Sequence, residues 1–465
     1  MRVLLITLLI SCNIMLFSQQ KINPNLFGFR MSTSFIFFDV NDSLFSNKVI
    51  ELNPRVLCFP GGFGNFYHLK GAGYGFDVSE VAMYNKGEKA EIGKSLNWIS
   101  KKKGHTKNYI YDFISLVKRT QSKVVFNINI LNEPVADYIK VLEMFEENDI
   151  EVIAIELGGE LYTRGYKDMI DGELYIQLAR TCANNIKKYY PNILIGVVAA
   201  PVNTLRRHNQ WNKKLAIENF YDAIIVHSYA KVTKGDAVAG KMILEEEESD
   251  DKGVAFDIYK QRAINYFNND YPANIQEYVA AFDKPIWITE WNLQMSKITA
   301  NTMLQSLFMA SYFLEISTNP KLKNIELTTF HNMAGRTLSG SMLLRKNDKT
   351  HILSTYMPAH MLSEIFFDEN YNIEKVNLSD ECFKYVLTQD NNDKKIICWV
   401  NWSENEMDSQ KLDGRWFQKE YYGKKLFSNT FDQDGIIYRE KKEKFYYGGI
   451  KIKPYSIIMI IQGEK

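Results

Sequence analysis

The sequence predicts an α/β protein, a (β/α)8 TIM barrel followed by a C-terminal all-β sandwich domain. Eight short runs rich in Val, Ile and Leu alternate with longer segments of helical periodicity. These runs are continuously apolar, which is typical of parallel strands that are covered on both faces. From about Asn370 onward the pattern changes to short strands separated by polar turns.

Length and charge restrict the class of protein. The chain has 465 residues, which exceeds what one small core needs, so one large and one smaller domain are expected. Lys and Arg number 56 against 55 Asp and Glu, and this near-neutral balance argues against a nucleic-acid binder. A hydrophobic fraction of 46% excludes a largely disordered chain.

The first 18 residues resemble a secretory signal peptide. Arg2 precedes a mostly apolar stretch, residues 3–17, which is shorter than the roughly 20 residues of a membrane-spanning helix. Ser18 offers a small residue at a cleavage site. Residues 9–12 also resemble a bacterial lipoprotein box, which would leave Cys12 lipid-modified. We therefore expect an exported protein, secreted or periplasmic, with lipid anchoring through Cys12 as the alternative and no transmembrane segment.

The barrel is expected over residues 19–369 and the sandwich over residues 370–465. An open doubly wound sheet is the structural alternative, but it would usually carry a GxGxxG phosphate turn, and the glycine-rich turn FPGGFG at residues 59–64 lacks that spacing. Helical periods lie between the strands, notably at residues 135–147, 174–186 and 301–318. The predicted barrel strands are residues 26–32, 55–60, 123–130, 152–157, 193–199, 222–227, 286–289 and 324–330.

Four cysteines remain after the signal segment, and we expect mostly free, packed thiols. Cys382 and Cys398 lie on two predicted strands joined by a turn near residues 390–393. With that turn at the centre, Cys382 faces about Asn401 and Cys398 faces about Tyr385, so a direct disulfide is not expected. The chain has no CxxC and no zinc-type spacing.

Polar side chains gather where the predicted barrel strands end, which is where barrels of this kind place their function. Strand four runs into Glu160 and strand seven into Glu290, with aromatic and amide residues beside them. Cleavage of a glycosidic bond needs such a pair, one carboxyl group protonated and the other ionised. Aromatic rings stack on sugar faces, and amides bind sugar hydroxyls.

Three segments resemble the clan A retaining glycoside hydrolases. Residues 156–162 (ELGGELY) are similar to the strand-four acid/base motif of the clan, and residues 285–292 (PIWITEWN) to its strand-seven nucleophile motif. Residues 59–62 (FPGG), with residues 65–68, resemble the strand-two turn in relatives of heparanase, β-glucuronidase, arabinofuranosidase and agarase type. The resemblance covers roughly residues 25–365, and the β-sandwich also fits it.

The resemblance implies a role for each matching residue. Glu160 would be the general acid/base, Glu290 the nucleophile, and Tyr229 a hydrogen-bond partner of Glu290. The two carboxyl groups are expected about 5 Å apart. The substrate would be a poly- or oligosaccharide, and no metal or cofactor is expected because two carboxylates suffice. The residues implied to line the sugar site are Asn65, Tyr67, His68, Gly159, His227, Tyr229, Trp291, Asn292 and His331.

Two positions depart from the clan pattern. The clan usually has Asn immediately before the acid/base, where it bonds the sugar 2-hydroxyl, but this chain has Gly159. The related strand-two motif often has Arg where this chain has Cys58. Both losses thin the polar network and point to an atypical substrate or a weakened enzyme. A non-catalytic carbohydrate-binding protein on a decayed barrel is therefore the main alternative, and a structural protein that presents its sandwich to a partner is a further one.

Residues 132–134 (NEP) also look like the acid/base signature of the clan. They follow the third predicted strand and open the helix expected at residues 135–147. Pro134 suits a first helical turn, and Glu133 suits the positive end of a helix. Because the next strand ends in Glu160, counting strands favours Glu160 over Glu133.

Overall fold

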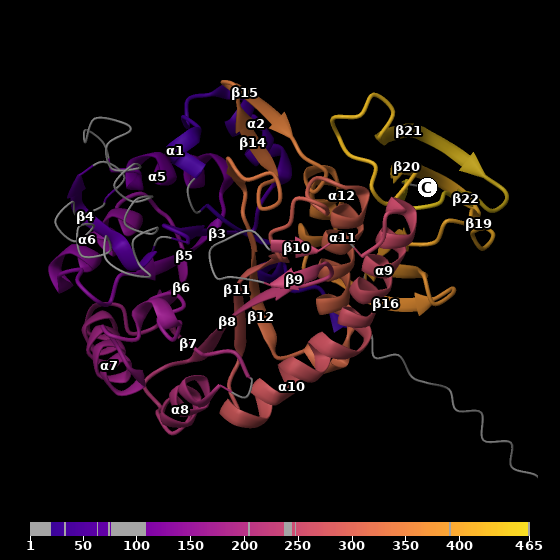
Figure 1. Cartoon of the computed structure of the whole chain (residues 1–465). Coiled ribbons are helices and arrows are strands. Elements are labelled where there is room, and N and C mark those ends of the chain that lie inside the picture. The colour runs from indigo at the N-terminus through magenta and orange to yellow at the C-terminus, as the bar shows by residue number, and fades with distance from the viewer. Residues whose placement is uncertain are drawn as a thin grey trace, which may run out of the picture.

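The computed structural model (Figure 1) describes residues 20–31, 34–62, 64–72, 75, 108–202, 205–236, 244–246, 248–389 and 392–463. The predicted signal peptide with Cys12, and part of the turn predicted near residues 390–393, lie outside these ranges. Among the helices of the described residues, none is long and apolar enough to cross a membrane.

Eight parallel strands close into the predicted barrel, so the open doubly wound sheet is excluded. Each strand pairs with its successor in the chain, and the last pairs with the first. All eight overlap the strands predicted from the sequence. They are β2 (Gly28–Arg30), β3 (Val56–Phe59), β5 (Lys123–Ile128), β6 (Val152–Leu157), β7 (Leu194–Val198), β8 (Ala223–Ala230), β11 (Ile286–Leu293) and β12 (Ile325–His331).

Side chains fill the barrel interior below the strand ends, as in other packed barrels. The largest of them is Trp287, which is 2% exposed. A Cβ at Gly196 on β7 would come within 2.6 Å of its ring, so glycine makes room for the indole. The other members of this cluster are Val56, Cys58, Val125, Ala154, Ala223, Ile225 and Leu327.

Helices surround the barrel (Figure 1). Those predicted from periodicity are present as α6, α7 and α11, although on α7 Tyr175 is buried and Leu174, expected on the apolar face, is 40% exposed. The helices are α1 (Ser34–Phe37), α2 (Ser43–Leu52), α5 (Ile110–Thr120), α6 (Val135–Glu146), α7 (Gly172–Tyr189), α8 (Arg206–Leu215), α9 (Lys252–Asn265), α10 (Tyr271–Phe282), α11 (Met303–Thr318) and α12 (Tyr356–Phe366).

Short strands lie at the carboxyl end of the barrel, in the loops that follow the barrel strands. Three of them, β13, β14 and β15, form one small sheet, and β9 pairs with β10. They are β4 (Tyr67–Ala72), β9 (Lys234–Asp236), β10 (Leu244–Glu246), β13 (Ala334–Gly335), β14 (Leu343–Lys346) and β15 (Lys349–Ile352).

The C-terminal domain is the predicted all-β unit, built on a seven-stranded antiparallel sheet in the order β1-β16-β17-β18-β23-β20-β21. One face packs on α11 and α12 (Figure 1), and the other covers a second apolar cluster. A small sheet of β19 and β22 lies apart from it. The strands are β1 (Gln20–Lys21), β16 (Tyr371–Asn377), β17 (Cys382–Gln389), β18 (Asn392–Asn401), β19 (Met407–Asp408), β20 (Gly414–Gly423), β21 (Ile436–Tyr446), β22 (Lys451–Ile452) and β23 (Ser456–Gln462).

The cysteine register agrees with the sequence prediction. Cys382 pairs across β17 and β18 with Asn401, and Cys398 pairs with Tyr385. Both are free and buried, as are Cys58 and Cys182. The two thiols are therefore out of register, and the prediction that they form no direct disulfide is confirmed.

Candidate active site

Four barrel strands bring ionisable side chains to one place at their carboxyl ends. Glu160 follows β6, and Glu290 lies within β11, in register with His227 on β8. Arg30 ends β2. Strand pairing in a closed barrel thus joins groups that are far apart in the sequence.

Glu290 lies at the centre of this cluster, and its side chain is 10% exposed. Its Oε1 lies 3.0 Å from Arg30 Nε, and its Oε2 accepts a hydrogen bond of 2.6 Å from the Tyr229 hydroxyl. Burial by itself would raise the pKa of Glu290, but the positive charges of His227 and Arg30 and the bond from Tyr229 hold it well below its usual value. Glu290 is therefore ionised at neutral pH.

Glu160 is presented by a strained turn. Gly158 has φ +77°, and Glu160 itself has φ +47°, a left-handed conformation that is uncommon outside glycine. Asn65 clamps the turn, because its Oδ1 accepts from the Gly159 N–H at 2.7 Å and its Nδ2 donates to the Gly159 carbonyl at 2.5 Å. The Glu160 side chain remains 39% exposed, so solvent and ligands can reach it.

His227 lies between the two carboxylates. Its Nδ1 is 3.0 Å from Glu160 Oε1 and 3.6 Å from Glu290 Oε2, while Nε2 contacts Thr289 Oγ1 at 3.2 Å. Burial by itself would lower the pKa of His227, but Glu290, Glu156 and Glu160 outweigh burial and raise it to about 10. At neutral pH the ring is an imidazolium.

Arg30 is a site residue that sequence reasoning missed. Its guanidinium is 1% exposed, and Nη1 donates to Glu156 Oε2 at 2.9 Å and to the Thr289 carbonyl at 3.1 Å. Nη2 donates to the Gly61 carbonyl at 3.2 Å. The available signal was a lone arginine at the end of an otherwise apolar strand, where a charge needs a buried partner.

The partner of Arg30 is Glu156, whose side chain is fully buried in the barrel interior. Burial would raise the pKa of Glu156, but Arg30 and His227 keep it below the usual value. Glu156 thus points inward and forms a buried ion pair with Arg30. The guanidinium missing at Cys58 comes instead from the neighbouring strand, because Arg30 and Cys58 are direct register partners.

The carboxylates of Glu160 and Glu290 face one another. Ligand atoms of Glu160, His227 and Glu290 all lie within 4.8 Å of one another. Two carboxylates and an imidazole are also a possible metal ligand set. Here His227 bonds Glu160, while Glu290 accepts from Tyr229 and forms an ion pair with Arg30.

Two residues expected to touch the sugar have other surroundings. Side chains alternate along β11, so Trp291 points away from the barrel interior, where it is buried and stacks on Tyr312 at 3.7 Å between centroids. Asn292 is 2% exposed and donates to the His331 carbonyl at 2.7 Å. The expectation that these side chains line the subsite is therefore corrected: Trp291 packs behind the strand, and Asn292 braces the loop after β12.

The residues predicted as rim contacts after β3, the second barrel strand, also mostly pack against other parts of the protein. Tyr67 is 2% exposed, and its ring packs against Phe59, which corrects the expectation of a rim contact. Asn65, also expected at the rim, is 6% exposed and holds the Glu160 turn. His68 is partly exposed, and its Nδ1 lies 2.6 Å from Glu133 Oε2.

The side chain of Glu133, the alternative candidate for the acid/base, is buried. Its side chain is 2% exposed, and besides His68 it accepts a hydrogen bond from the Leu69 N–H at 2.9 Å. These contacts tie β4 to the start of α6. The exposed, cluster-facing position belongs to Glu160.

His331 completes the inner wall of the site. Its ring lies edge-on to Tyr229, with 6.2 Å between centroids. Burial lowers the pKa of His331, and Arg30 and His227 lower it further against the opposing effect of Glu290. His331 is thus a neutral imidazole beside the charged one of His227.

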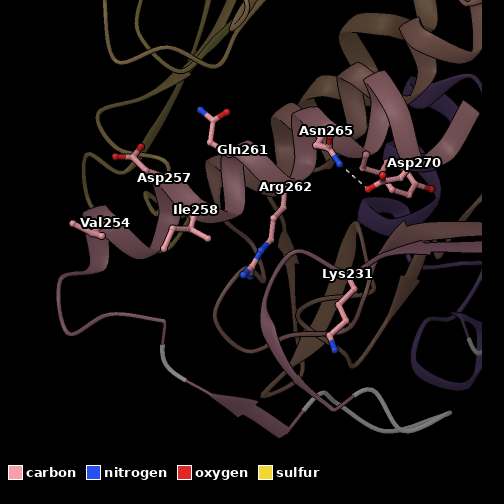
Figure 2. Close-up of a pocket in the computed structure, with 9 residues that line it drawn as sticks. Lys231, Val254, Asp257, Ile258, Gln261, Arg262, Asn265 and Asp270 are labelled. Carbon is pink, nitrogen blue, oxygen red and sulfur yellow. Dashed lines mark hydrogen bonds between the residues drawn. The ribbon is translucent and has the colours of Figure 1, made fainter.

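A pocket of about 740 Å³ lies outside this cluster, along α9. Figure 2 shows Lys231 and Arg262 pointing into the space between α9 and the chain below it, with Asp257 and Gln261 directed elsewhere. The pocket adjoins the outer side of β8, where Ser228 bonds Tyr266. It is therefore separate from the carboxylate cluster.

The fold is shared with solved glycoside hydrolases. The GH51 arabinofuranosidase from Xanthomonas axonopodis pv. citri superposes with a TM-score of 0.67 at 13% identity, covering 96% of this chain and 98% of that one. An α-L-arabinofuranosidase from Thermotoga maritima gives 0.66 at 11% identity, with coverages of 95% and 97%. A GH30 endoxylanase from Clostridium papyrosolvens C71 gives 0.50 at 11%, with coverages of 96% and 98%.

These similarities extend over both the barrel and the C-terminal domain, so they confirm the fold that the sequence resemblance implied. Identities this low establish the fold alone. No protein-family model and no curated protein sequence matches the chain.

Proposed function

We propose that the protein is a retaining glycoside hydrolase that cleaves O-glycosidic bonds of a poly- or oligosaccharide, with Glu160 as acid/base and Glu290 as nucleophile. The observation that carries the proposal is the approach of their carboxylate atoms to within 4.8 Å. Retaining enzymes place the two carboxyl groups about 5–5.5 Å apart, and inverting enzymes about 6.5–9.5 Å. The fold shared with arabinofuranosidases and an endoxylanase supports the same class.

The reaction proceeds in two displacements. Ionised Glu290 attacks the anomeric carbon while Glu160 gives its proton to the departing oxygen, so the glycosidic bond breaks and a glycosyl ester forms. Water then attacks the same carbon and gives a proton to Glu160, and the ester bond to Glu290 breaks. The exposure of Glu160 lets it reach both the leaving oxygen and the water.

The two displacements keep the charge of the cluster balanced. Arg30 and the His227 imidazolium carry two positive charges, and Glu156 and Glu290 carry two negative ones. With the proton that the first displacement requires on Glu160, these charges sum to zero. In the ester intermediate Glu290 is uncharged and Glu160 is ionised, so the cluster is neutral again and no buried net charge develops.

The test is hydrolysis of a panel of polysaccharides and aryl glycosides, beginning with arabinofuranosides and xylan because the similar structures carry those names. Wild type is compared with Glu290→Ala, Glu160→Ala and, as the matched control, Glu133→Gln. We expect activity to be lost in the first two variants and kept in the third, and the anomeric configuration of the product to be retained by NMR.

Other results would redirect the assignment. Activity lost only with Glu133→Gln would move the acid/base to the earlier strand end. An inverted product would contradict double displacement. A glycan bound by the wild type without turnover would favour the non-catalytic carbohydrate-binding alternative.

Export through the N-terminal segment is part of the proposal and is supported by its short apolar run after Arg2. Mass spectrometry of the protein from its native host is the test. A mature chain that begins after Ser18 indicates a secreted or periplasmic protein, a lipid on Cys12 indicates an anchored one, and an intact N-terminus contradicts export.

A further inference from the structure

The two oxygens of the Glu290 carboxylate have different partners. Oε1 lies 3.0 Å from Arg30 Nε, whereas Oε2 is bonded by Tyr229 and lies 3.6 Å from His227 Nδ1. The same imidazole nitrogen is 3.0 Å from Glu160 Oε1. Oε2 is therefore the oxygen on the acid/base side, and Oε1 is the oxygen tied to the barrel interior.

Arg30 is itself fixed from several directions. Glu156, the Thr289 carbonyl and the Gly61 carbonyl accept hydrogen bonds from its two terminal nitrogens. A guanidinium is planar and offers its donors in fixed directions. These bonds fix the guanidinium with Nε 3.0 Å from Glu290 Oε1, in an ion-pair contact that lacks the geometry of a hydrogen bond.

We propose that Arg30 is a positioning residue that anchors Glu290 Oε1 and thereby presents Oε2 to the anomeric carbon. The inference rests on the proposed function, because it takes Glu290 as the nucleophile. The proposal places on β2, the first barrel strand, the guanidinium that the sequence resemblance places on β3, the second barrel strand.

The pairing of Arg30 with Cys58 on neighbouring strands allows an independent test of this proposal. Arg30 and Cys58 are direct partners on β2 and β3, and both side chains are buried. Cys58 Sγ lies 4.0 Å from Glu156 Oε2, so both side chains approach the same carboxylate. Exchanging the two residues keeps the total charge and side-chain volume and moves the guanidinium by one strand.

The experiment measures kcat/KM against pH for the wild type, Arg30→Cys, and the exchange of Arg30→Cys with Cys58→Arg. We expect Arg30→Cys to lower kcat/KM about 100-fold or more, as for loss of one preorganised donor. The acid limb of its profile should move to higher pH, because Glu290 loses a neighbouring positive charge. The exchange should recover at least about 10-fold of the loss and return the acid limb toward that of the wild type.

A folding control is needed, since Arg30→Cys leaves Glu156 buried without its partner. Arg30→Met combined with Glu156→Met removes both charges together and should fold while keeping the displaced acid limb. Lys375→Met removes the cation of another ion pair, with Glu315 at the interface between the two domains. It should lower thermal stability and leave the acid limb unchanged.

The outcomes separate the two levels of inference. A wild-type rate and acid limb in Arg30→Cys, or a folded exchange variant that recovers nothing, overturns the role of Arg30 and leaves the proposed function standing. A wild-type protein that turns over no glycan overturns the proposed function, and the role of Arg30 with it.

Discussion

The barrel and the C-terminal sheet each bury a carboxylate among cations, and they do so in opposite ways. In the sheet, Glu420 on β20 is 1% exposed and is bonded by Lys441, Lys453 and Gln418. The two lysines are 40% and 25% exposed, so the positive charges reach solvent and the carboxylate is sealed.

In the barrel the cations are buried and one carboxylate is exposed to solvent. The side chains of Arg30 and His227 are 1% and 4% exposed, whereas that of Glu160 is 39% exposed. In the sheet, donors surround the carboxylate of Glu420. In the barrel, the carboxylate of Glu160 stays accessible to a reacting molecule. The comparison teaches that exposure of one member, rather than burial of charge as such, distinguishes the candidate active site.

Replacing the exposed carboxylate of Glu160 should have the largest effect and tests whether exposure marks the active site. Glu160→Gln should lower the hydrolysis of substrates with poor leaving groups by about 10²–10⁴-fold, because they need a proton on the departing oxygen. Its unfolding free energy should change by no more than about 0.5 kcal/mol, since the side chain is partly solvated. Steady-state kinetics and urea denaturation measure both quantities. A large loss of stability with little loss of rate would make Glu160 a structural residue.

Removing the sealed carboxylate should have the reverse effect. Glu420→Leu should lower the unfolding free energy by about 1–3 kcal/mol, less than for a fully buried pair because the two lysines can be hydrated. Activity per folded molecule should not change. The matched control is Glu440→Gln, on the paired strand β21 with a 62% exposed side chain, which should alter stability by less than about 0.5 kcal/mol. A fall in kcat for Glu420→Leu would contradict the separation of the two clusters.

A smaller effect is expected in the pH dependence of stability. The pKa of His227 is raised from its ordinary value of 6.5 to about 10, so the folded protein holds a proton that the unfolded chain releases between these pH values. Its stabilisation is full below pH 6.5 and is lost as the pH rises through 10, with a slope of up to about 1.4 kcal/mol per pH unit.

The variant His227→Asn should show a shallower slope between pH 7 and 10 in urea denaturation. The matched control is His208→Asn, because burial lowers the pKa of His208 and its titration lies below that window. An unchanged slope in His227→Asn would mean that the ring is neutral in the folded protein.

Much of the fold could be predicted because it depends on local patterns. All eight barrel strands were found from apolar runs, since a strand covered on both faces must be apolar throughout. β21 is harder to recognise from the sequence for the converse reason. β21 is an edge strand with exposed charged residues, such as Lys441 and Lys444, and no apolar alternation marks it.

The candidate site was predicted less completely. Glu160, Glu290, His227 and Tyr229 meet as expected because each lies in or just beyond the carboxyl-terminal half of a barrel strand. Trp291 was misplaced although the alternation of side chains along a strand, counted from Glu290, would have turned it outward. The remaining errors concern burial, which depends on what covers a side chain.

The sequence by itself determined the number and order of the strands, the position of the carboxylates at two strand ends, and the register that keeps Cys382 and Cys398 apart. These follow from backbone geometry, which repeats over a few residues. The tertiary structure alone decided that Arg30 lies beside Cys58 and pairs with Glu156 and Glu290, and that an imidazolium lies between Glu160 and Glu290. Such contacts join residues more than 60 positions apart, as in the His227–Glu160 bond, and they arise only when the barrel closes and water is excluded from its interior.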